Sequence, residues 1–271
     1  MRTPARTLAE KINSIKLSGE LNVRSSALPT WCPGCGYFGI HQGINNAIVE
    51  LGLDLHNTVT VSGIGCAGRY SFFTSTYGLH TVHGRALPTA TGVKLANPAL
   101  TVFAVGGDGD GLAIGGGHFA HVGRRNVNIN YILFDNSIYG LTKGQPSPSS
   151  PLGTKTKASP AGTMDKPLNA TLMALTYGAS FVARLFAGDP AMITKAVVEG
   201  VQNPGFSFFH VYSSCVTFDK SFKTWSNLKK WVHPLPGNYD PTDYRQAVNE
   251  VLNDDFSLGV IYRRPSDSEQ G

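Results

Sequence analysis

Several short runs of apolar residues recur along the chain, each bounded by glycine, polar or turn-forming residues. Their length suits strands that are buried on both faces, because the runs are too short for a confident helix. Segments long enough for helices lie between several of them. This alternation is typical of an α/β domain with a doubly wound, mostly parallel sheet. The predicted strands are 58–62, 100–105, 127–134, 180–186 and 206–212.

Helical spacing of apolar positions adds further elements. Helices are predicted at 166–177, 190–202 and 241–252, and a short last strand at 256–262. Leu8, Ile12 and Ile15 recur at helical spacing near the N-terminus, within an otherwise polar segment. We therefore divide the chain into an N-terminal arm (1–30), a main domain (31–231) and a C-terminal extension (232–271).

Composition narrows the class of protein. With 271 residues, of which 41% are hydrophobic, the chain is long enough to bury a core. The net charge of +5 and the pI near 9.0 suit either an acidic partner or weak polyanion binding. No basic run is interleaved with aromatic residues, so we expect no nucleic-acid partner. No segment reads as a signal peptide or membrane span, so we expect a cytoplasmic protein.

The segment after the strand at 100–105 is rich in glycine and contains two carboxylates. Glycines remove the Cβ atoms that would keep a backbone away from a phosphate group. Carboxylates at the carboxyl end of a strand are ligands for a hard cation such as Mg²⁺. The turn therefore suits a metal-bound pyrophosphate. Its residues are Gly106, Gly107, Gly109 and Gly111, with Asp108 and Asp110.

The next predicted strand, 127–134, is followed by Asp135 and Asn136. A parallel βαβ crossover would return these residues to the sheet edge that holds Asp108. The GDG triplet and its spacing to an asparagine resemble the thiamine diphosphate motif. That resemblance implies that Asp108, Asn136 and the backbone carbonyl of Ile138 bind magnesium. The triplet alone fits an ordinary βα turn followed by an Asx turn equally well, and the paired spacing favours the cofactor.

Two cysteines, Cys32 and Cys35, flank a Pro-Gly pair that forms a tight turn. Such a knuckle can bind zinc, bind an iron–sulfur cluster or act as a redox dithiol. The dithiol ranks third, because it requires a thioredoxin-like strand before the motif and this segment is polar.

The remaining cysteines, Cys66 and Cys215, each follow a predicted strand. Ends of parallel strands share one sheet edge, so these thiols can meet beside the glycine turn. Four thiolates suit a [4Fe–4S] cluster or a zinc ion, and the residues alone favour the two equally. Inert core thiols are a weaker alternative.

Six ordered motifs resemble the β subunit of 2-oxoacid:ferredoxin oxidoreductases, above all the 2-oxoglutarate type. They cover about residues 30–216 and comprise WCPGCGYFGI, SGIGCAGR, HGRALPTATGVKLANP, VGGDGDGLAIGGGH, FDNSIYGLTKGQ and the late Cys215. The resemblance implies the thiamine-diphosphate-binding fold and one [4Fe–4S] cluster on Cys32, Cys35, Cys66 and Cys215, rather than zinc. It also implies oxidative decarboxylation of 2-oxoglutarate with coenzyme A to succinyl-CoA, CO₂ and reduced ferredoxin. Pyruvate or another 2-oxoacid is the alternative substrate.

The same resemblance assigns roles to individual residues. Leu141 would support the bent conformation of the cofactor, and Lys143 would lie near the substrate entrance. Arg69 stands where some relatives have a lysine near the 2-oxoacid carboxylate; it can form two hydrogen bonds to a carboxylate, or serve in a structural salt bridge. The remaining cofactor contacts implied are Gly65, His83, Gly84, Arg85, Gly107, Gly109, Asp110 and Gly140. Arg69, Lys143 and His83 are the candidate catalytic residues, and for His83 a buried core histidine is the alternative.

The resemblance also implies partners. We find no glutamate in a segment that matches the one thiamine enzymes place against the pyrimidine ring, and relatives supply it from an α subunit. We therefore expect an αβ or (αβ)₂ assembly that is inactive without its α subunit. Ferredoxins are acidic, so Lys220, Lys223, Lys229 and Lys230 form a candidate docking face, with a solvated surface as the alternative. The proline- and serine-rich loop 145–163 is a candidate lid or interface strip.

The residues alone are also compatible with two other functions. A non-oxidative thiamine-dependent decarboxylase subunit would share the metal motif but have no use for four converging thiols. A basic, zinc-stabilised binding protein would account for the pI and the cysteines alone. Absorption spectra and metal content of the purified protein distinguish the three.

Overall fold

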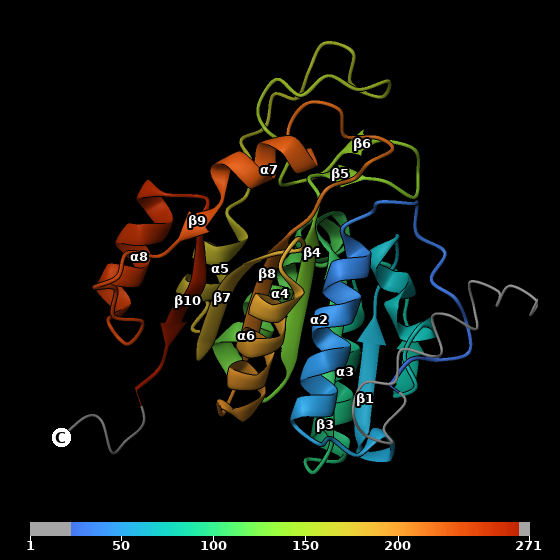
Figure 1. Cartoon of the computed structure of the whole chain (residues 1–271), viewed down its shortest axis with the longest axis vertical. Helices are drawn as coiled ribbons and strands as arrows, with labels where there is room; N and C mark the ends of the chain where they lie inside the picture. The colour runs from blue at the N-terminus through green and yellow to red at the C-terminus, as the bar shows by residue number, and fades with distance from the viewer. Residues whose placement is uncertain (1–22, 266–271) are drawn as a thin grey trace, which may run out of the picture.

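A computed structural model describes residues 23–265 as a layered α/β domain (Figure 1). The helix predicted around Leu8, Ile12 and Ile15 lies outside the described residues. Within residues 23–265, no helix is both long and apolar enough to cross a membrane.

The central sheet has eight strands in the order β2-β1-β3-β4-β8-β7-β10-β9. From β2 to β7 all neighbours are parallel, and β10 joins β7 in the antiparallel sense. The doubly wound, mostly parallel sheet is therefore confirmed. The strands are β1 (Thr58–Ser62), β2 (Tyr77–His80), β3 (Thr101–Gly107), β4 (Asn130–Asp135), β7 (Phe181–Phe186), β8 (Ser207–Tyr212), β9 (His233–Pro234) and β10 (Ser257–Arg263).

Helices cover both faces of the sheet, which explains why its central strands read as continuous apolar runs. In β3, Phe103 packs on one face, against the helices α2 (Tyr37–Glu50) and α6 (Pro190–Gln202). Its neighbour Ala104 packs on the opposite face. Figure 1 shows α2 and α6 in front of the sheet. The opposite face is covered by α3 (Ala86–Ala96), α4 (Gly116–Arg125), α5 (Ala170–Thr176) and α8 (Tyr244–Asn253).

Some boundaries and elements differ from the sequence prediction. The helix predicted from residue 166 begins at Ala170, because the Asn169 side chain accepts a hydrogen bond from the Leu172 N–H and caps the helix there. The sequence analysis did not predict β2, which has only four residues, all exposed at the sheet edge, and no continuous apolar run. The remaining elements are η1 (Leu55–Asn57), η2 (Ala67–Phe72), the π-helical η3 (Gly109–Ile114), β5 (Ile138–Tyr139), β6 (Gln145–Pro146) and α7 (Trp225–Trp231).

Candidate functional site

The carboxyl ends of β3 and β4 meet at the edge where the sequence placed the metal site. The two strands pair in parallel, and Asp108 and Asn136 follow them directly. Both residues line one pocket, together with Gly107 and Ile138. The structure thus brings together the three residues implied as magnesium ligands. Further predicted contacts line the same pocket: Gly65, His83, Gly109, Asp110, Gly140 and Leu141.

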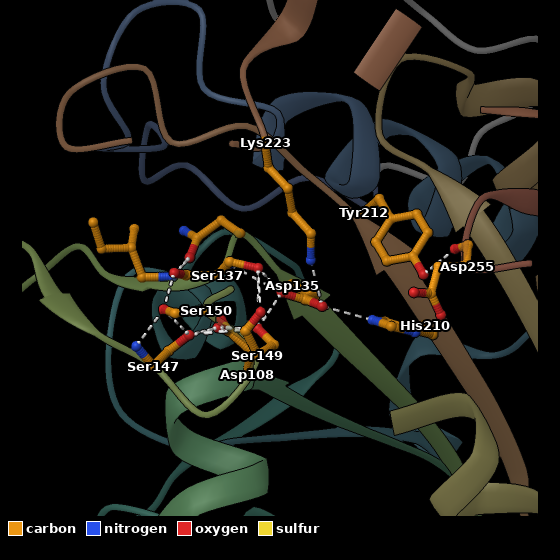
Figure 2. Close-up of polar contacts among 12 residues, drawn as sticks. Asp108, Asp135, Ser137, Ser147, Ser149, Ser150, His210, Tyr212, Lys223 and Asp255 are labelled. Carbon is orange, nitrogen blue, oxygen red and sulfur yellow. Dashed lines mark hydrogen bonds and ion pairs between the residues drawn. The ribbon is translucent and has the colours of Figure 1, made fainter. Parts of the chain in front are cut away.

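Asp108 is buried and is contacted by hydroxyl groups (Figure 2). Ser147 donates a short hydrogen bond to its Oδ2, and the Ser149 Oγ lies 2.8 Å from the same atom. Burial and the neighbouring Asp135 carboxylate raise the pKa of Asp108 to about 7, despite the hydroxyls and nearby Lys223, which lower it. A buried carboxylate of this kind favours a cation in the adjoining pocket.

Asp135 forms an ion pair with a buried lysine, Lys223. Lys223 Nζ lies 2.6 Å from Asp135 Oδ2, and His210 Nε2 lies 2.7 Å from the same oxygen (Figure 2). Burial alone would raise the pKa of Asp135, but the Lys223 ammonium and the His210 hydrogen bond outweigh burial and hold it below the usual range. Ser149 Oγ lies 2.8 Å from Asp135 Oδ1 and so bridges the two aspartates. We call Asp135, His210 and Lys223 the charged triad.

His210 completes the charged triad in its neutral form. Burial lowers the pKa of His210, although the Asp135 carboxylate opposes that shift. The hydrogen-bond partners assign the tautomer: Nε2–H donates to Asp135, and Nδ1, 2.9 Å from Thr171 Oγ1, accepts from that hydroxyl. The triad therefore balances one buried carboxylate against one buried ammonium group.

Asp110 ties together three segments of the pocket wall. Its Oδ1 accepts hydrogen bonds from the backbone N–H groups of Ile64, at 3.0 Å, and Gly84, at 2.8 Å. His83 Nδ1 lies 2.7 Å from the same oxygen. Asp110 thus joins the glycine turn to the loop after β1 and to the HGR motif, in addition to lining the pocket.

The glycines of the turn make room for different groups. A Cβ on Gly109 would come within 2.3 Å of the Tyr139 ring, and one on Gly111 within 1.9 Å of the Tyr131 hydroxyl oxygen. A Cβ on Gly107 would meet only ordinary contacts, the nearest at 3.7 Å. The space beside Gly109 and Gly111 therefore accommodates tyrosine side chains, which the sequence analysis did not foresee, whereas Gly107 leaves its side open.

Asn136 is fixed by two hydrogen bonds. Its Oδ1 accepts from the Ile138 N–H at 3.1 Å, which forms an Asx turn, and its Nδ2 donates to the Tyr37 hydroxyl at 2.8 Å. The Asx turn and the position beside Asp108 thus occur together, although the sequence analysis treated them as alternatives. Tyr37 is 2% exposed, begins α2 and also lines the pocket.

The four cysteines gather next to this pocket. All are free thiols, and the Cys35 sulfur interacts electrostatically with those of Cys32, Cys66 and Cys215. Burial, above all, raises the pKa of Cys35 to about 12 and also raises that of Cys66. Two indole N–H groups support the loops: Trp31 donates to the Cys66 carbonyl at 2.7 Å, and Trp225 to the Gly34 carbonyl at 2.8 Å.

The thiols adjoin the pocket directly, because Cys66 is one of its lining residues. Gly140 lines the pocket too, and a Cβ at this position would lie 3.6 Å from the Cys66 sulfur and 3.7 Å from the Cys215 sulfur. Among residues 23–265, no group of three or more His, Cys, Asp or Glu side chains is arranged to hold a metal ion.

Other predicted residues lie outside the pocket lining. Arg69 Nη1 donates to Thr30 Oγ1 at 2.8 Å, and Arg85 Nη1 donates to the carbonyls of His83 and Ile114, both at 3.3 Å. Lys143 is exposed, and its backbone adopts a φ of +78°. Gly84 contributes only its backbone N–H, to Asp110.

Sequence reasoning missed several residues and placed one wrongly. Ser147 and Ser149 come from the loop 145–163, where the only signal was an abundance of serine and proline. Lys223 was assigned to the ferredoxin-docking face, and that assignment is wrong because the side chain is buried against Asp135. Lys220, Lys229 and Lys230 are exposed.

Comparison with known proteins agrees with this architecture. Residues 56–211 match the family model described as the C-terminal thiamine-pyrophosphate-binding domain of thiamine pyrophosphate enzymes. Residues 215–270 match the C-terminal region of the pyruvate ferredoxin oxidoreductase beta subunit. The β subunit of 2-oxoacid:ferredoxin oxidoreductase 2 of Aeropyrum pernix is 41% identical over 254 residues, which span 89% of this chain and 82% of that protein. The chain belongs to this family of β subunits.

Members that act on 2-oxoglutarate are among the relatives of this β subunit. The 2-oxoglutarate oxidoreductase subunit KorB of Mycobacterium tuberculosis is 46% identical over 193 residues, which span 71% of this chain and 52% of KorB. The solved structure of 2-oxoglutarate:ferredoxin oxidoreductase from Magnetococcus marinus, with 2-oxoglutarate, coenzyme A and succinyl-CoA bound, superimposes with a TM-score of 0.88. It is 41% identical, and the match covers 90% of this chain and 84% of that one.

Proposed function

We propose that this β subunit serves a 2-oxoglutarate:ferredoxin oxidoreductase. The reaction is the oxidation of 2-oxoglutarate with coenzyme A to succinyl-CoA and CO₂, with two electrons passed to ferredoxin. The subunit binds thiamine diphosphate with Mg²⁺ and one [4Fe–4S] cluster. The observation that supports this best is that Cys66 lines the same pocket as Asp108, with the Cys215 sulfur also beside the pocket residue Gly140.

The donor set around the pocket fits a magnesium-bound pyrophosphate. Asp108 offers one buried carboxylate, Asn136 an amide oxygen with a free lone pair, and Ile138 a backbone carbonyl at the pocket wall. Magnesium takes one or two carboxylates and completes its shell with phosphate oxygens and water. Lys223 is paired with Asp135, so its charge does not substitute for the metal at Asp108.

The thiols fit ligands of a cluster. In a [4Fe–4S] cluster each thiolate binds a different iron atom, so the sulfurs surround a shared space rather than converge on one ion. Burial disfavours the thiolate form of Cys35 and Cys66, so binding of iron must displace their protons.

The residues of this chain then have distinct tasks. Thiamine diphosphate supplies the electron sink that decarboxylation of a 2-oxoacid requires. Asp108 and Asn136 hold the pyrophosphate end through the metal, and the Asp110 contacts keep the wall at His83 in place. Arg69, half-buried three residues after Cys66, would supply a charge for the substrate carboxylate, although here its Nη1 donates to Thr30 Oγ1. The four cysteines would hold the [4Fe–4S] cluster, which would accept the electrons.

Two measurements test the proposal. The complex with its α subunit, purified without oxygen, should be brown, bleach with dithionite, and reduce viologen with 2-oxoglutarate and coenzyme A. Turnover on a panel of oxoacids should favour 2-oxoglutarate over pyruvate. Colourless anaerobic protein that contains thiamine diphosphate would instead indicate the non-oxidative decarboxylase, and turnover by this chain alone would refute the need for an α subunit.

A further inference from the structure

Tyr37 is the residue that touches both halves of the site. Its backbone N–H hydrogen-bonds to the Cys35 sulfur, and its hydroxyl accepts from Asn136 Nδ2 at 2.8 Å. The ring is held edge-on between Trp31 and Phe134, with centroids 5.9 and 5.0 Å away. Tyr37 therefore has little freedom to move the hydroxyl away from Asn136.

The Ile138 N–H decides which way the Asn136 amide faces, and the Tyr37 hydroxyl holds the amide in that orientation. An amide can rotate to exchange its oxygen and nitrogen, and only the oxygen binds a hard cation. Here the Ile138 N–H needs Oδ1 as acceptor, so Nδ2 faces Tyr37 and its hydroxyl accepts the bond.

We propose that Tyr37 is a positioning residue for the metal: its hydroxyl fixes the Asn136 amide with Oδ1 available to magnesium. Because Tyr37 lies two residues after Cys35, the segment that carries two thiols also contacts the proposed metal ligand Asn136. This inference rests on the proposed function, since it assumes the magnesium site at Asp108 and Asn136.

Removal of the hydroxyl should weaken metal binding specifically. In Tyr37→Phe the ring keeps its packing and the backbone bond to Cys35, but Nδ2 of the buried Asn136 loses its partner. Loss of a group that orients a metal ligand typically lowers metal affinity 10- to 100-fold. We expect the Mg²⁺ concentration for half-maximal binding of thiamine diphosphate to rise about 10-fold or more in Y37F.

Tyr70 provides a matched control. It is also fully buried, and its hydroxyl donates to the side-chain oxygen of another asparagine, Asn45, at 3.1 Å. Its ring packs near the same Phe134, with centroids 6.1 Å apart. Y70F removes a buried hydrogen bond of the same kind away from the pocket, so a general loss of stability should affect both variants alike.

The experiment uses the anaerobic complex with its α subunit, stripped of thiamine diphosphate and Mg²⁺ with EDTA. Thiamine diphosphate binding is followed by quenching of intrinsic fluorescence during Mg²⁺ titration, and iron content and the reduced-cluster EPR signal are measured in parallel. The inference is supported if Y37F shifts the Mg²⁺ midpoint about 10-fold with unchanged cluster content, and Y70F shifts it less than twofold.

Three results would overturn the role of Tyr37: a Y37F midpoint within twofold of wild type, equal shifts in Y37F and Y70F, or loss of the cluster in Y37F.

The Asp108→Asn variant distinguishes a failure of this inference from a failure of the proposed function. If D108N abolishes the Mg²⁺-dependent binding of thiamine diphosphate while Y37F matches wild type, the metal site is supported and the role of Tyr37 is refuted. If the wild type itself shows no Mg²⁺-dependent binding, the proposed function fails and this inference fails with it.

Discussion

Replacement of Lys223 by methionine tests whether the charged triad holds the end of β4 in place. Methionine keeps most of the length and apolar body of the side chain but removes the ammonium group 2.6 Å from Asp135 Oδ2. It also removes the cation–π contact with the Tyr212 ring, whose centroid lies 4.7 Å from Lys223 Nζ. Asp135, 1% exposed, would keep its hydrogen bonds but lose its counter-charge.

We expect a large loss of stability because both members of the ion pair, Lys223 and Asp135, are buried. Removal of one partner of a buried ion pair typically destabilises a protein by about 3–5 kcal/mol, since the remaining charge is uncompensated. Lys220→Met is the control: Lys220 lies on the same segment but is exposed, and surface substitutions change stability by about 0.5 kcal/mol or less. The double variant Asp135→Asn with Lys223→Met removes both charges and should be more stable than K223M alone.

Urea unfolding of the anaerobic protein, followed by tryptophan fluorescence, measures these differences. We expect K223M to lower the free energy of unfolding by about 3 kcal/mol or more, with part of the loss recovered in the double variant. A K223M variant within about 1 kcal/mol of wild type, or one no less stable than K220M, would refute the reasoning.

Three further predictions follow from other positions. Arg69→Met should raise the KM for 2-oxoglutarate about tenfold, because it removes a charge-assisted hydrogen bond to a carboxylate; a KM equal to that of wild type contradicts the substrate role. Burial lowers the pKa of His41 to about 4, so between pH 6.5 and pH 4 the unfolded chain binds a proton that the folded chain excludes. The free energy of unfolding of the wild type, relative to that of His41→Gln, should therefore fall by about 1 kcal/mol from pH 7 to pH 5.5. A difference that does not change with pH would contradict the lowered pKa of His41. Charge reversal at the exposed Lys229 and Lys230 should raise the apparent KM for ferredoxin at low salt but not at high salt, and an unchanged KM removes the docking face.

Apolar runs predicted the central strands, and helical spacing predicted α5, α6 and α8, but α2 was not predicted although its buried Ile40 and Ile44 recur at helical spacing. The central strands are buried on both faces, so their apolar runs stand out and their ends place Asp108 and Asn136 at one edge. The strand β2 was missed because its residues are exposed. The short α7 was missed because only Leu228 in it is buried.

The site could be predicted only where the spacing of residues along the chain determines their positions in the fold. A strand, a helix and a second strand return Asn136 to Asp108 whatever the intervening residues are. The contacts of Ser149 and Lys223 depend on how a loop and a distant segment fold back, which no local pattern specifies. A lysine in a basic segment is usually solvated, and its burial became evident only when Asp135 was placed beside it.

The position of Gly140, which lines the pocket together with Cys66, has a practical consequence for handling of the protein. Because this glycine adjoins both the pocket and two of the sulfurs, oxidative damage on one side would disturb the other. We expect brief exposure to air to release thiamine diphosphate together with iron. For the same reason, an alanine at this position would place a methyl group 3.6 Å from the Cys66 sulfur and 3.7 Å from the Cys215 sulfur.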